Sequence, residues 1–146
     1  MKQGRVLVTA GPTREPIDSV RFISNYSSGF MGYSIARQAK ARGYEVTLIT
    51  GPTSLELPAG IKVVAVNSAS DMFRAVKEFY RSADIIIMAA AVCDFRPSIE
   101  RKRKIKPKDQ ITGLALTRNP DILHWLGKNK KKRIRIRTAQ TAAANE

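Results

Sequence analysis

Residues 6–32 read VLVTAGPTREPIDSVRFISNYSSGFMG and contain the beginning of an α/β unit. The apolar, β-branched run at residues 6–8 is typical of a buried parallel strand, and the breaker cluster at residues 10–12 ends it. After a polar loop, residues 27–39 begin with small side chains and continue with apolar residues at helical spacing. The stretch therefore predicts a strand, a loop and a helix, with a ligand site above the carboxyl end of the strand.

The start of this predicted helix is suited to an anion. Small residues let a ligand approach the backbone, and the first N–H groups of a helix have no intrahelical acceptor. The helix dipole adds roughly 0.3–1 kcal/mol for a negative group there, and up to about 2 kcal/mol when the group is partly buried. We therefore expect a phosphorylated ligand at residues 27–32. The alternative is that Ser28 caps the helix and that Gly29 and Gly32 permit close packing.

Further strands and helices alternate along the chain. Apolar runs predict strands at residues 46–49, 63–66 and 85–88. The last of these is the most apolar, so we place it at the centre of the sheet. Alternation of this kind predicts the α/β class, with a Rossmann-like open, mostly parallel sheet flanked by helices on both faces.

Two later helices have recognisable caps. An amphipathic pattern predicts a helix over residues 70–82, with Ser70 as N-cap. A shorter helix is predicted over residues 119–127, with Asn119 as N-cap and a proline at its first position.

The remaining segments are polar and charged. Residues 94–113 combine two prolines with many charges, which predicts a mobile loop. Residues 128–146 are basic and then small and polar, and the alternation at Ile134 and Ile136 is compatible with an edge strand. We therefore divide the chain into a Rossmann-like domain at residues 1–127, with residues 94–113 as its flap, and a tail at residues 128–146.

Positive charge is concentrated late in the chain. The formal net charge is +14 at pH 7, of which +3 falls in residues 1–100 and +11 in residues 101–146. Two blocks carry most of the excess, residues 101–108 and residues 128–137. Such blocks are suited to the phosphates of a nucleotide or of nucleic acid.

Composition argues against several classes of protein. No apolar run approaches the roughly 18 residues that span a membrane, and the first residues lack the apolar segment of a signal peptide. Cys93 and His124 are each single, so they form no internal disulfide and no closed zinc site. We expect a cytoplasmic protein without membrane association, whose residues alone provide no metal site.

A nicotinamide enzyme is not indicated. The G-x-G-x-x-G fingerprint is missing, and the strand at residues 46–49 is followed by Thr50 and Gly51 rather than by an acid for the ribose hydroxyls. His124 has no G-x-S-x-G elbow to serve, which also argues against serine hydrolysis.

Four blocks of sequence resemble one known family. They read VTAGPTREPIDSVRFISNYSSGFMG at residues 8–32, AAAVCDFRP at 89–97, KIKP at 104–107 and NPDIL at 119–123. In this order and spacing they resemble the phosphopantothenoylcysteine synthetase domain. That domain is the cysteine-ligase half of the bacterial bifunctional coenzyme A protein, also called the DNA/pantothenate-metabolism flavoprotein. The resemblance covers the chain from about residue 5 to about residue 126.

The resemblance implies CTP-dependent ligation of 4′-phosphopantothenate with cysteine in coenzyme A biosynthesis. The substrate carboxylate would attack the α-phosphate of CTP to give an acyl-cytidylate and pyrophosphate, and the amine of cysteine would then displace CMP. Bringing two anions together requires cations, here lysine and Mg²⁺. Family members are homodimers, and many also carry a flavin-dependent decarboxylase domain. We find no match to that domain and expect no flavin in this chain.

Site residues carry over from the matching positions. Asn25 matches the asparagine that contacts the acyl-cytidylate, and Lys104 matches the lysine on a flap that covers this intermediate, so these two are the catalytic candidates. The nucleotide-binding set is Met88, Ala89, Ala90, Asp94, Lys104, Pro120, Asp121, Ile122 and Leu123. The substrate-phosphate set is Gly11, Ser27, Ser28, Gly29 and Gly32. The alternatives are a turn role for Asn25 and a solvated loop charge at Lys104.

The chain departs from the family pattern near its end. Pro107 stands where the family usually has lysine, and residues 137–141 stand where it has Gly-Phe-Ala-x-Glu. The family continues beyond this point, so we expect a sheet that is incomplete at its C-terminal side and a tail that is truncated or non-native. Two alternatives to an active ligase are an inactive fragment and a basic nucleic-acid-binding module. The second is disfavoured because few aromatic residues interleave the basic runs.

Overall fold

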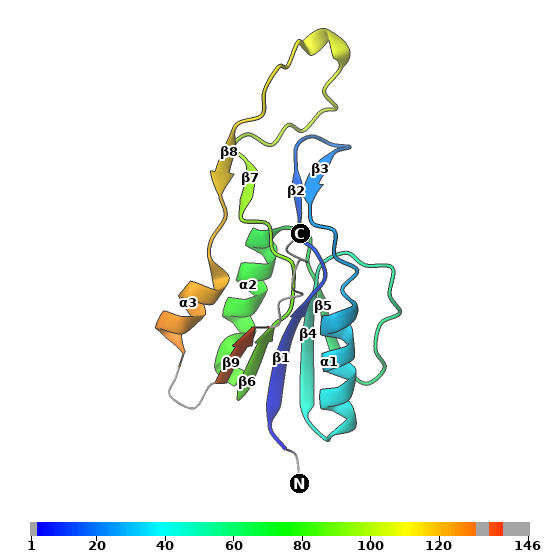
Figure 1. Cartoon of the computed structure of the whole chain (residues 1–146), viewed down its shortest axis with the longest axis vertical. Helices are drawn as coiled ribbons and strands as arrows, with labels where there is room; N and C mark the ends of the chain where they lie inside the picture. The colour runs from blue at the N-terminus through cyan, green and yellow to red at the C-terminus, as the bar shows by residue number, and fades with distance from the viewer. Residues whose placement is uncertain (1–2, 131–134, 139–146) are drawn as a thin grey trace, which may run out of the picture.

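A five-stranded parallel sheet forms the body of the molecule in a computed structural model, which describes residues 3–130 and 135–138 (Figure 1). Its strands, in the order β5-β4-β1-β6-β9, are all paired in parallel. They are β1 (Arg5–Ala10), β4 (Glu45–Thr50), β5 (Lys62–Ala65), β6 (Ile85–Met88) and β9 (Arg135–Thr138). The predicted Rossmann-like class is confirmed.

Helices cover both faces of the sheet, as predicted. They are α1 (Phe30–Ala41), α2 (Ala69–Phe79), α3 (Ile122–Asn129) and the short 3₁₀ turns η1 (Tyr80–Ser82) and η2 (Pro107–Asp109). Alternation along β1 directs Leu7 into a core with α2 and α3, and directs Val8 into a second core against Tyr33 and Ala36 of α1. The two cores fix both helix layers relative to the end of β1.

The central strand is β1, so the prediction that residues 85–88 lie at the centre is wrong. β6 lies between β1 and β9, and Ile85 and Ile87 are only partly buried, whereas Val8 is completely buried. A short apolar run indicates that a strand is buried by a neighbouring layer, but it does not give the position of the strand within the sheet.

Both predicted caps are displaced along the chain. Ser68, not Ser70, caps α2, because its hydroxyl accepts from Asp71 N while the Asp71 carboxylate accepts from Ser68 N. Asp121, not Asn119, caps α3, which then continues through Gly127 to Asn129. The α2 cap is selected by the local Ser68–Asp71 pair, whereas Asn119 is engaged by distant residues, through its contacts with Arg96 and Cys93.

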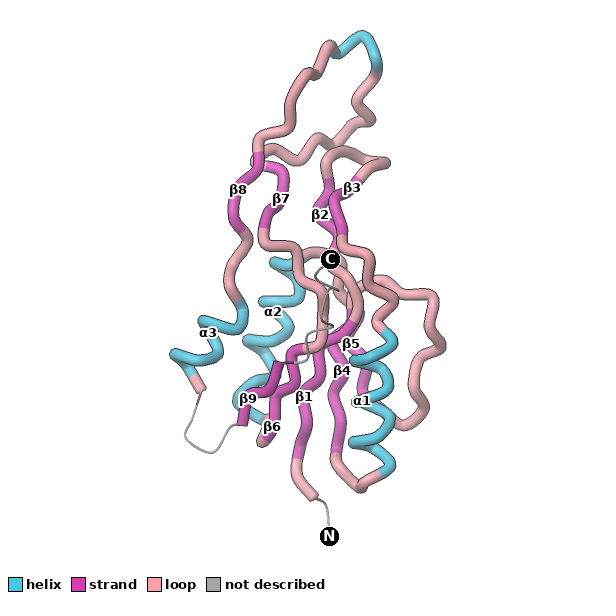
Figure 2. Tube along the Cα trace, in the orientation of Figure 1, coloured by secondary structure: helices cyan, strands magenta, loops and turns pink. Residues whose placement is uncertain are grey.

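An arm projects beyond the carboxyl edge of the sheet (Figure 2). It consists of the antiparallel pair β2 (Arg14–Pro16) and β3 (Phe22–Ser24), the antiparallel pair β7 (Phe95–Pro97) and β8 (Leu116–Arg118), and the loop of residues 98–115. Residues 94–113, predicted as a loop, thus include β7 and η2, and the β2–β3 pair lies in a stretch predicted as loop. Both pairs are three residues long, too short for a clear alternation.

The predicted tail contributes to the sheet. β9 falls within residues 128–146 and pairs with β6, so the edge strand suggested by the alternation is present. Ile134 and residues 139–146 lie outside the described residues. The prediction that the tail is truncated or non-native therefore also falls outside them. No helix in the described part of the chain is long and apolar enough to cross a membrane.

Candidate functional site

The carboxyl ends of β1 and β6 continue side by side past the sheet. Thr9 pairs with Met88, and beyond the strands Pro12 forms a parallel bridge with Ala91. Ala91 N donates to Gly11 O at 2.9 Å, and Thr13 N donates to Ala91 O at 3.1 Å. The two exit segments are therefore fixed to one another at the edge where open α/β sheets bind ligands.

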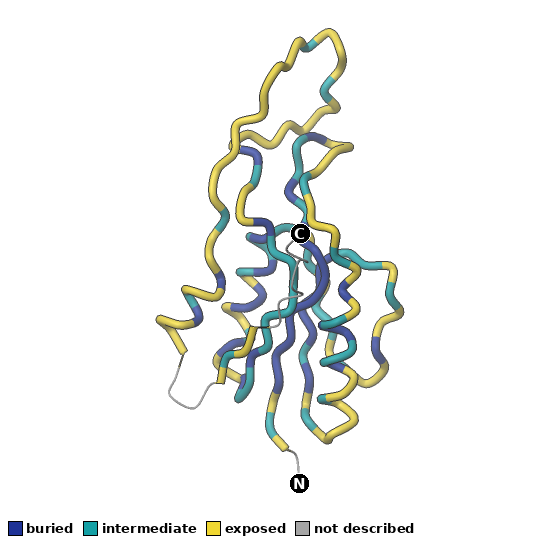
Figure 3. Tube along the Cα trace, in the orientation of Figure 1, coloured by how far each residue is buried: buried dark blue, intermediate teal, exposed yellow. Residues whose placement is uncertain are grey.

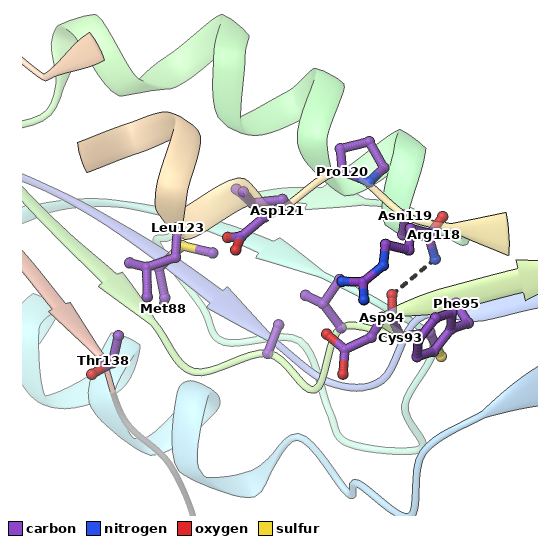
Figure 4. A pocket seen from close by; sticks show the side chains of 13 residues that line it. Met88, Cys93, Asp94, Phe95, Arg118, Asn119, Pro120, Asp121, Leu123 and Thr138 are labelled. Atoms are coloured by element: carbon purple, nitrogen blue, oxygen red, sulfur yellow. Dashed lines mark hydrogen bonds between the residues drawn. The ribbon is translucent and has the colours of Figure 1, made fainter. Parts of the chain in front are cut away.

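A cleft of about 530 Å³ opens between the exit of β6 and the start of α3 (Figure 4). A cavity of this size is within the range of small-molecule sites. It is lined by Met88, Ala90, Val92, Cys93, Asp94, Phe95, Arg118, Asn119, Pro120, Asp121, Ile122, Leu123 and Thr138. The lining includes every predicted nucleotide-binding residue except Ala89 and Lys104.

A buried hydroxyl shapes the inner wall of this cleft. Thr9 is fully buried, and its Oγ1 accepts from Ala89 N at 3.2 Å and from Ala90 N at 3.3 Å. The hydroxyl also lies 3.8 Å from the sulfur of Met88. Backbone groups that leave a strand require acceptors when they are buried, and Thr9 provides one for two of them. This contact sets the course of the chain along the cleft.

Asp94 is held at its backbone and exposed at its side chain. Thr13 Oγ1 accepts from Cys93 N at 2.9 Å, and Asn119 Nδ2 donates to Cys93 O at 2.8 Å (Figure 4). Asn119 N in turn donates to Asp94 O at 2.8 Å. The carboxylate of Asp94 is therefore presented to the cleft from a fixed backbone, as a ligand-binding group requires.

Six lining residues were not identified from the sequence, and three of them, Phe95, Arg118 and Asn119, add an aromatic ring, a cation and an amide to the cleft. The guanidinium of Arg118 lies 5.7 Å from the centre of the Phe95 ring, which gives the cleft an aromatic face beside a cation. Asn119 was predicted as a cap, but its Oδ1 accepts from Arg96 Nη1 at 3.0 Å. Each of the three belongs to, or directly adjoins, a block that carries the family resemblance. That position in the sequence was the one feature from which they could have been predicted as cleft residues.

Asn25 lies behind one wall of the cleft. Its Nδ2 donates to Ala91 O at 3.0 Å and lies 3.7 Å from the sulfur of Cys93, a residue that lines the cleft. Cys93 itself is buried, and burial raises the pKa of its thiol. Asn25 is exposed and does not line the cleft, so the structure brings it near the predicted nucleotide-binding residues without placing it among them.

The small-residue turn before α1 is tightly packed. Gly29 adopts a φ of 81° and approaches Gly11 so closely that an added Cβ would stand 3.3 Å from Gly11 Cα. A Cβ on Gly32 would stand 2.5 Å from that of Ala10. The packing alternative therefore accounts for Gly32. Gly29, rather than Ser28, occupies the cap position.

The same turn retains groups that suit an anion. The hydroxyl of Ser27 accepts from Gly29 N and that of Ser28 accepts from Phe30 N, each at 3.3 Å, so both hydroxyls lie at the start of α1. The next backbone N–H groups, at residues 31 and 32, belong to the first helical turn and have no intrahelical acceptor. The structure thus brings the predicted phosphate set together around one helix start.

Lys104 is separated from both groups. It lies in the loop of residues 98–115, is exposed and does not line the cleft. The structure describes no cluster of three or more His, Cys, Asp or Glu side chains that could hold a metal ion within residues 3–130 and 135–138. Asp94 and Asp121 nevertheless both line the cleft, and two carboxylates are enough to assist a metal that arrives with a nucleotide.

Comparison with known proteins identifies relatives of this chain. The coenzyme A biosynthesis bifunctional protein CoaBC of Bacillus subtilis (strain 168) is 47% identical over 132 residues, which are 90% of this chain and 32% of that protein. A cysteine/cysteine sulfinic acid decarboxylase from an unknown prokaryotic organism is 50% identical over 129 residues, 88% of this chain and 36% of that protein. The chain thus spans about a third of the length of these curated relatives.

The fold has a solved counterpart. The crystal structure of the C-terminal domain of a coenzyme A biosynthesis bifunctional protein CoaBC matches with a TM-score of 0.80 and 44% identity, covering 92% of this chain and 63% of that one. A family model described as the DNA/pantothenate metabolism flavoprotein C-terminal domain matches residues 1–144. The chain belongs to the family of DNA/pantothenate metabolism flavoprotein C-terminal domains, as its sequence blocks predicted.

Proposed function

We propose that this domain ligates 4′-phosphopantothenate to cysteine with CTP as the activating nucleotide, a step of coenzyme A biosynthesis. The observation that carries the proposal is the cleft between β6 and α3. It gathers nearly all of the nucleotide-binding residues transferred by resemblance, in a chain whose curated relative is named for coenzyme A biosynthesis. The ligase domain corresponds to residues 1–127 together with β9.

The chemistry takes place in two balanced steps. A carboxylate oxygen of the substrate attacks the α-phosphorus of CTP, and the bond to pyrophosphate breaks, which leaves an acyl-cytidylate. The amine of cysteine then attacks the acyl carbon, the bond to CMP breaks and the amine loses a proton. Stabilising the charge that develops in both steps requires positioned donors.

The cleft supplies groups for each part of the nucleotide. The Phe95 ring offers a stacking surface to a base, the Asp94 carboxylate accepts from an amino or hydroxyl group, and the Arg118 guanidinium suits a phosphate. Pro120, Ile122 and Leu123 supply the apolar side of the cleft. Asp94 and Asp121 are the residues that would help to hold Mg²⁺, whose chemistry when bound is to neutralise phosphate charge.

The turn before α1 would receive the phosphate of 4′-phosphopantothenate. The hydroxyls of Ser27 and Ser28 and the first-turn N–H groups surround one helix start, where the dipole favours an anion. Gly11 and Gly29 bring the backbone close to this point. Asn25 contacts Ala91 and Cys93 at one wall of the cleft, and its amide would contact the acyl-cytidylate.

Exposed apolar residues on the arm support a homodimer. Val20, Phe22, Ile99, Leu114 and Leu116 are large, apolar and at least 45% exposed, and all belong to the arm, which is largely exposed along its length (Figure 3). A concentration of this kind is typical of a surface that binds another protein.

One relative is named for a decarboxylase activity, and the matched region is 36% of its length. We assign that activity to a separate domain of the longer protein.

The direct test is turnover. The protein is incubated with 4′-phosphopantothenate, cysteine, CTP and Mg²⁺, and the release of pyrophosphate and CMP is measured separately. We expect one of each per amide formed. Absence of both pyrophosphate release and CTP binding would remove the activity from this chain.

Two variants separate the half-reactions. Asn25→Asp places a negative charge where the acyl-cytidylate is expected, and Lys104→Gln removes a flap cation. We expect each to lower turnover by about 10²–10³-fold, as the loss of one stabilising donor does. Asn25→Asp should slow the release of CMP and Lys104→Gln the release of pyrophosphate. Wild-type turnover in both variants would refute the catalytic assignments.

A further inference from the structure

The carboxylate of Asp18 lies in the arm and accepts three backbone hydrogen bonds. Its side chain is fully buried. Oδ1 accepts from Val20 N at 2.8 Å and from Arg21 N at 2.7 Å, which closes the turn between β2 and β3. Oδ2 accepts from Ile105 N at 3.0 Å, across 87 residues of sequence. One oxygen therefore serves the local turn, and the other serves the distant loop of residues 98–115.

Two further contacts join the same turn to that loop. Arg21 pairs with the Asp18 carboxylate at 3.3 Å and donates through Nη2 to Ile105 O at 3.1 Å. Arg101 N donates to Ile17 O at 3.0 Å. The loop is thus held at residue 101 and at residue 105, one on each side of Lys104.

The free end of the loop is braced internally. The guanidinium of Arg103 binds both carboxylate oxygens of Asp109, at 2.9 and 3.1 Å, and Lys106 N donates to Asp109 Oδ2 at 2.7 Å. Residues 103, 105 and 106 are therefore each tied, while the side chain of Lys104 between them is exposed. This arrangement fixes the backbone of Lys104 and leaves its side chain exposed.

We propose that Asp18 is a positioning residue, which holds the loop of residues 98–115 so that Lys104 is presented from a fixed backbone. The inference rests on the function proposed above for the role of Lys104, but the contact between Asp18 and Ile105 can be tested without it. Side chains that place a reacting group within a fraction of an ångström are required for efficient catalysis on a loop.

Asp71 shows what a purely local aspartate of the same kind does. It pairs with Arg74, three residues on, at 3.3 Å, as Asp18 pairs with Arg21. Its other hydrogen bonds go to Ser68 N and to the Ser68 hydroxyl, within its own helix cap. Asp18 differs by its hydrogen bond to Ile105 and by its complete burial, since the Asp71 side chain is 37% exposed, so Asp71 provides a control for an aspartate with local contacts.

The test is amide hydrogen exchange in the full chain, comparing Asp18→Asn with the wild type. An asparagine keeps one oxygen as acceptor for the N–H groups of Val20 and Arg21. Its NH₂ group then faces the N–H of Ile105, and an NH₂ group cannot accept that hydrogen bond. We expect the Ile105 amide to exchange about tenfold faster or more, which is the effect of losing one charge-assisted hydrogen bond. The amides of Val20 and Arg21 should keep their protection.

Asp71→Asn is the control and should leave the Ile105 amide unchanged. If Asp18→Asn leaves Ile105 exchange at the wild-type rate, the contact does not hold the loop and the proposal fails. If Asp18→Asn unfolds the chain, Ile105→Pro replaces it, because proline removes the donated N–H and leaves Asp18 intact. In that variant the exchange rate of the Arg101 amide is measured instead, and it should rise if the loop is released. An unchanged rate at Arg101 would equally overturn the proposal.

Kinetics test the positioning role separately. Asp18→Asn should lower kcat about tenfold with KM for CTP unchanged, because the contact acts on the loop and not on the cleft. Faster Ile105 exchange with unchanged kcat would overturn the positioning role. A wild-type protein without turnover would refute the proposed function, and amide exchange would still decide whether Asp18 holds the loop.

Discussion

The two sides of the paired strands β1 and β6 differ in how tightly the chain is packed beyond their carboxyl ends. On the flank towards α1, Gly11, Gly29 and Gly32 stand where a Cβ would meet a neighbouring atom at 3.3 Å or less. On the flank towards α3, the chain leaves β6 along an open cleft of about 530 Å³. A glycine-rich turn in a sequence can therefore mark close packing, while the larger binding space lies on the other side of the same strands.

The largest expected effect lies on the packed flank. A Cβ on Gly51 would collide with the carbonyl oxygen of Pro12, a backbone atom that cannot turn aside. We expect Gly51→Ala to lower the free energy of unfolding by about 3 kcal/mol or more, as overpacking against backbone does. Chemical denaturation with urea measures this change.

The control for that substitution is Gly127→Ala. Apart from the adjoining residues and the nearby backbone of the helix itself, no atom lies within 4 Å of the position of the added Cβ, and residue 127 is inside α3. Alanine is the better helix former by roughly 0.5–1 kcal/mol, so this variant should be slightly more stable than the wild type. Equal stability of the two variants would contradict the contrast between packed and open glycines.

A smaller effect is expected where the cleft is shaped by one hydroxyl. Thr9→Val keeps the shape of the side chain but leaves Ala90 N without its acceptor, whereas Ala89 N keeps the carbonyl oxygen of Thr9 at 3.2 Å. We expect a loss of about 1–3 kcal/mol in the free energy of unfolding and weaker binding of CTP. Thr9→Ser retains the hydroxyl and should bind CTP like the wild type. If both variants bind CTP equally, the hydroxyl does not shape the cleft.

The smallest effect concerns the protonation of Asp18 in the arm. Hydrogen bonds from the backbone N–H of Ile105, and then from Val20 and Arg21, lower the pKa of Asp18 from 3.8 to about 2. Because the folded-state pKa is depressed, this carboxylate stabilises the fold above about pH 4, and its contribution is lost as the pH falls towards 2. A carboxyl-carbon NMR titration should give a midpoint near 2. A midpoint at the ordinary value would contradict the buried, three-donor geometry.

The sequence predicted the features that depend on local pattern. The apolar runs of β1, β4 and β6 and the helical spacing before Ala41 identified the parallel sheet and its helix layers. Most of the predicted nucleotide-binding residues line one cleft because the block at residues 88–94 follows a strand and the block at residues 120–123 begins a helix, positions at which open sheets bind ligands.

The features that were missed depend on distant partners. Asn119 carries the same cap signal as Asp121, and only its hydrogen bonds to Cys93 and Arg96 remove it from the cap. The rank of β6 within the sheet depends on its pairing with β9, which lies 50 residues further along. Asp18 has the appearance of a turn residue until Ile105 is placed beside it.

The most direct test of the account is a titration of the ¹⁵N-labelled full chain with CTP and Mg²⁺, followed by amide chemical shifts. A nucleotide site in the cleft predicts saturable shifts that gather on residues 88–95 and 118–123, and weaker binding by about 1.5–3 kcal/mol in Asp94→Ala, the effect of losing one hydrogen bond to a charged group. Shifts confined to residues 27–32, or no saturable shifts at all, would contradict it.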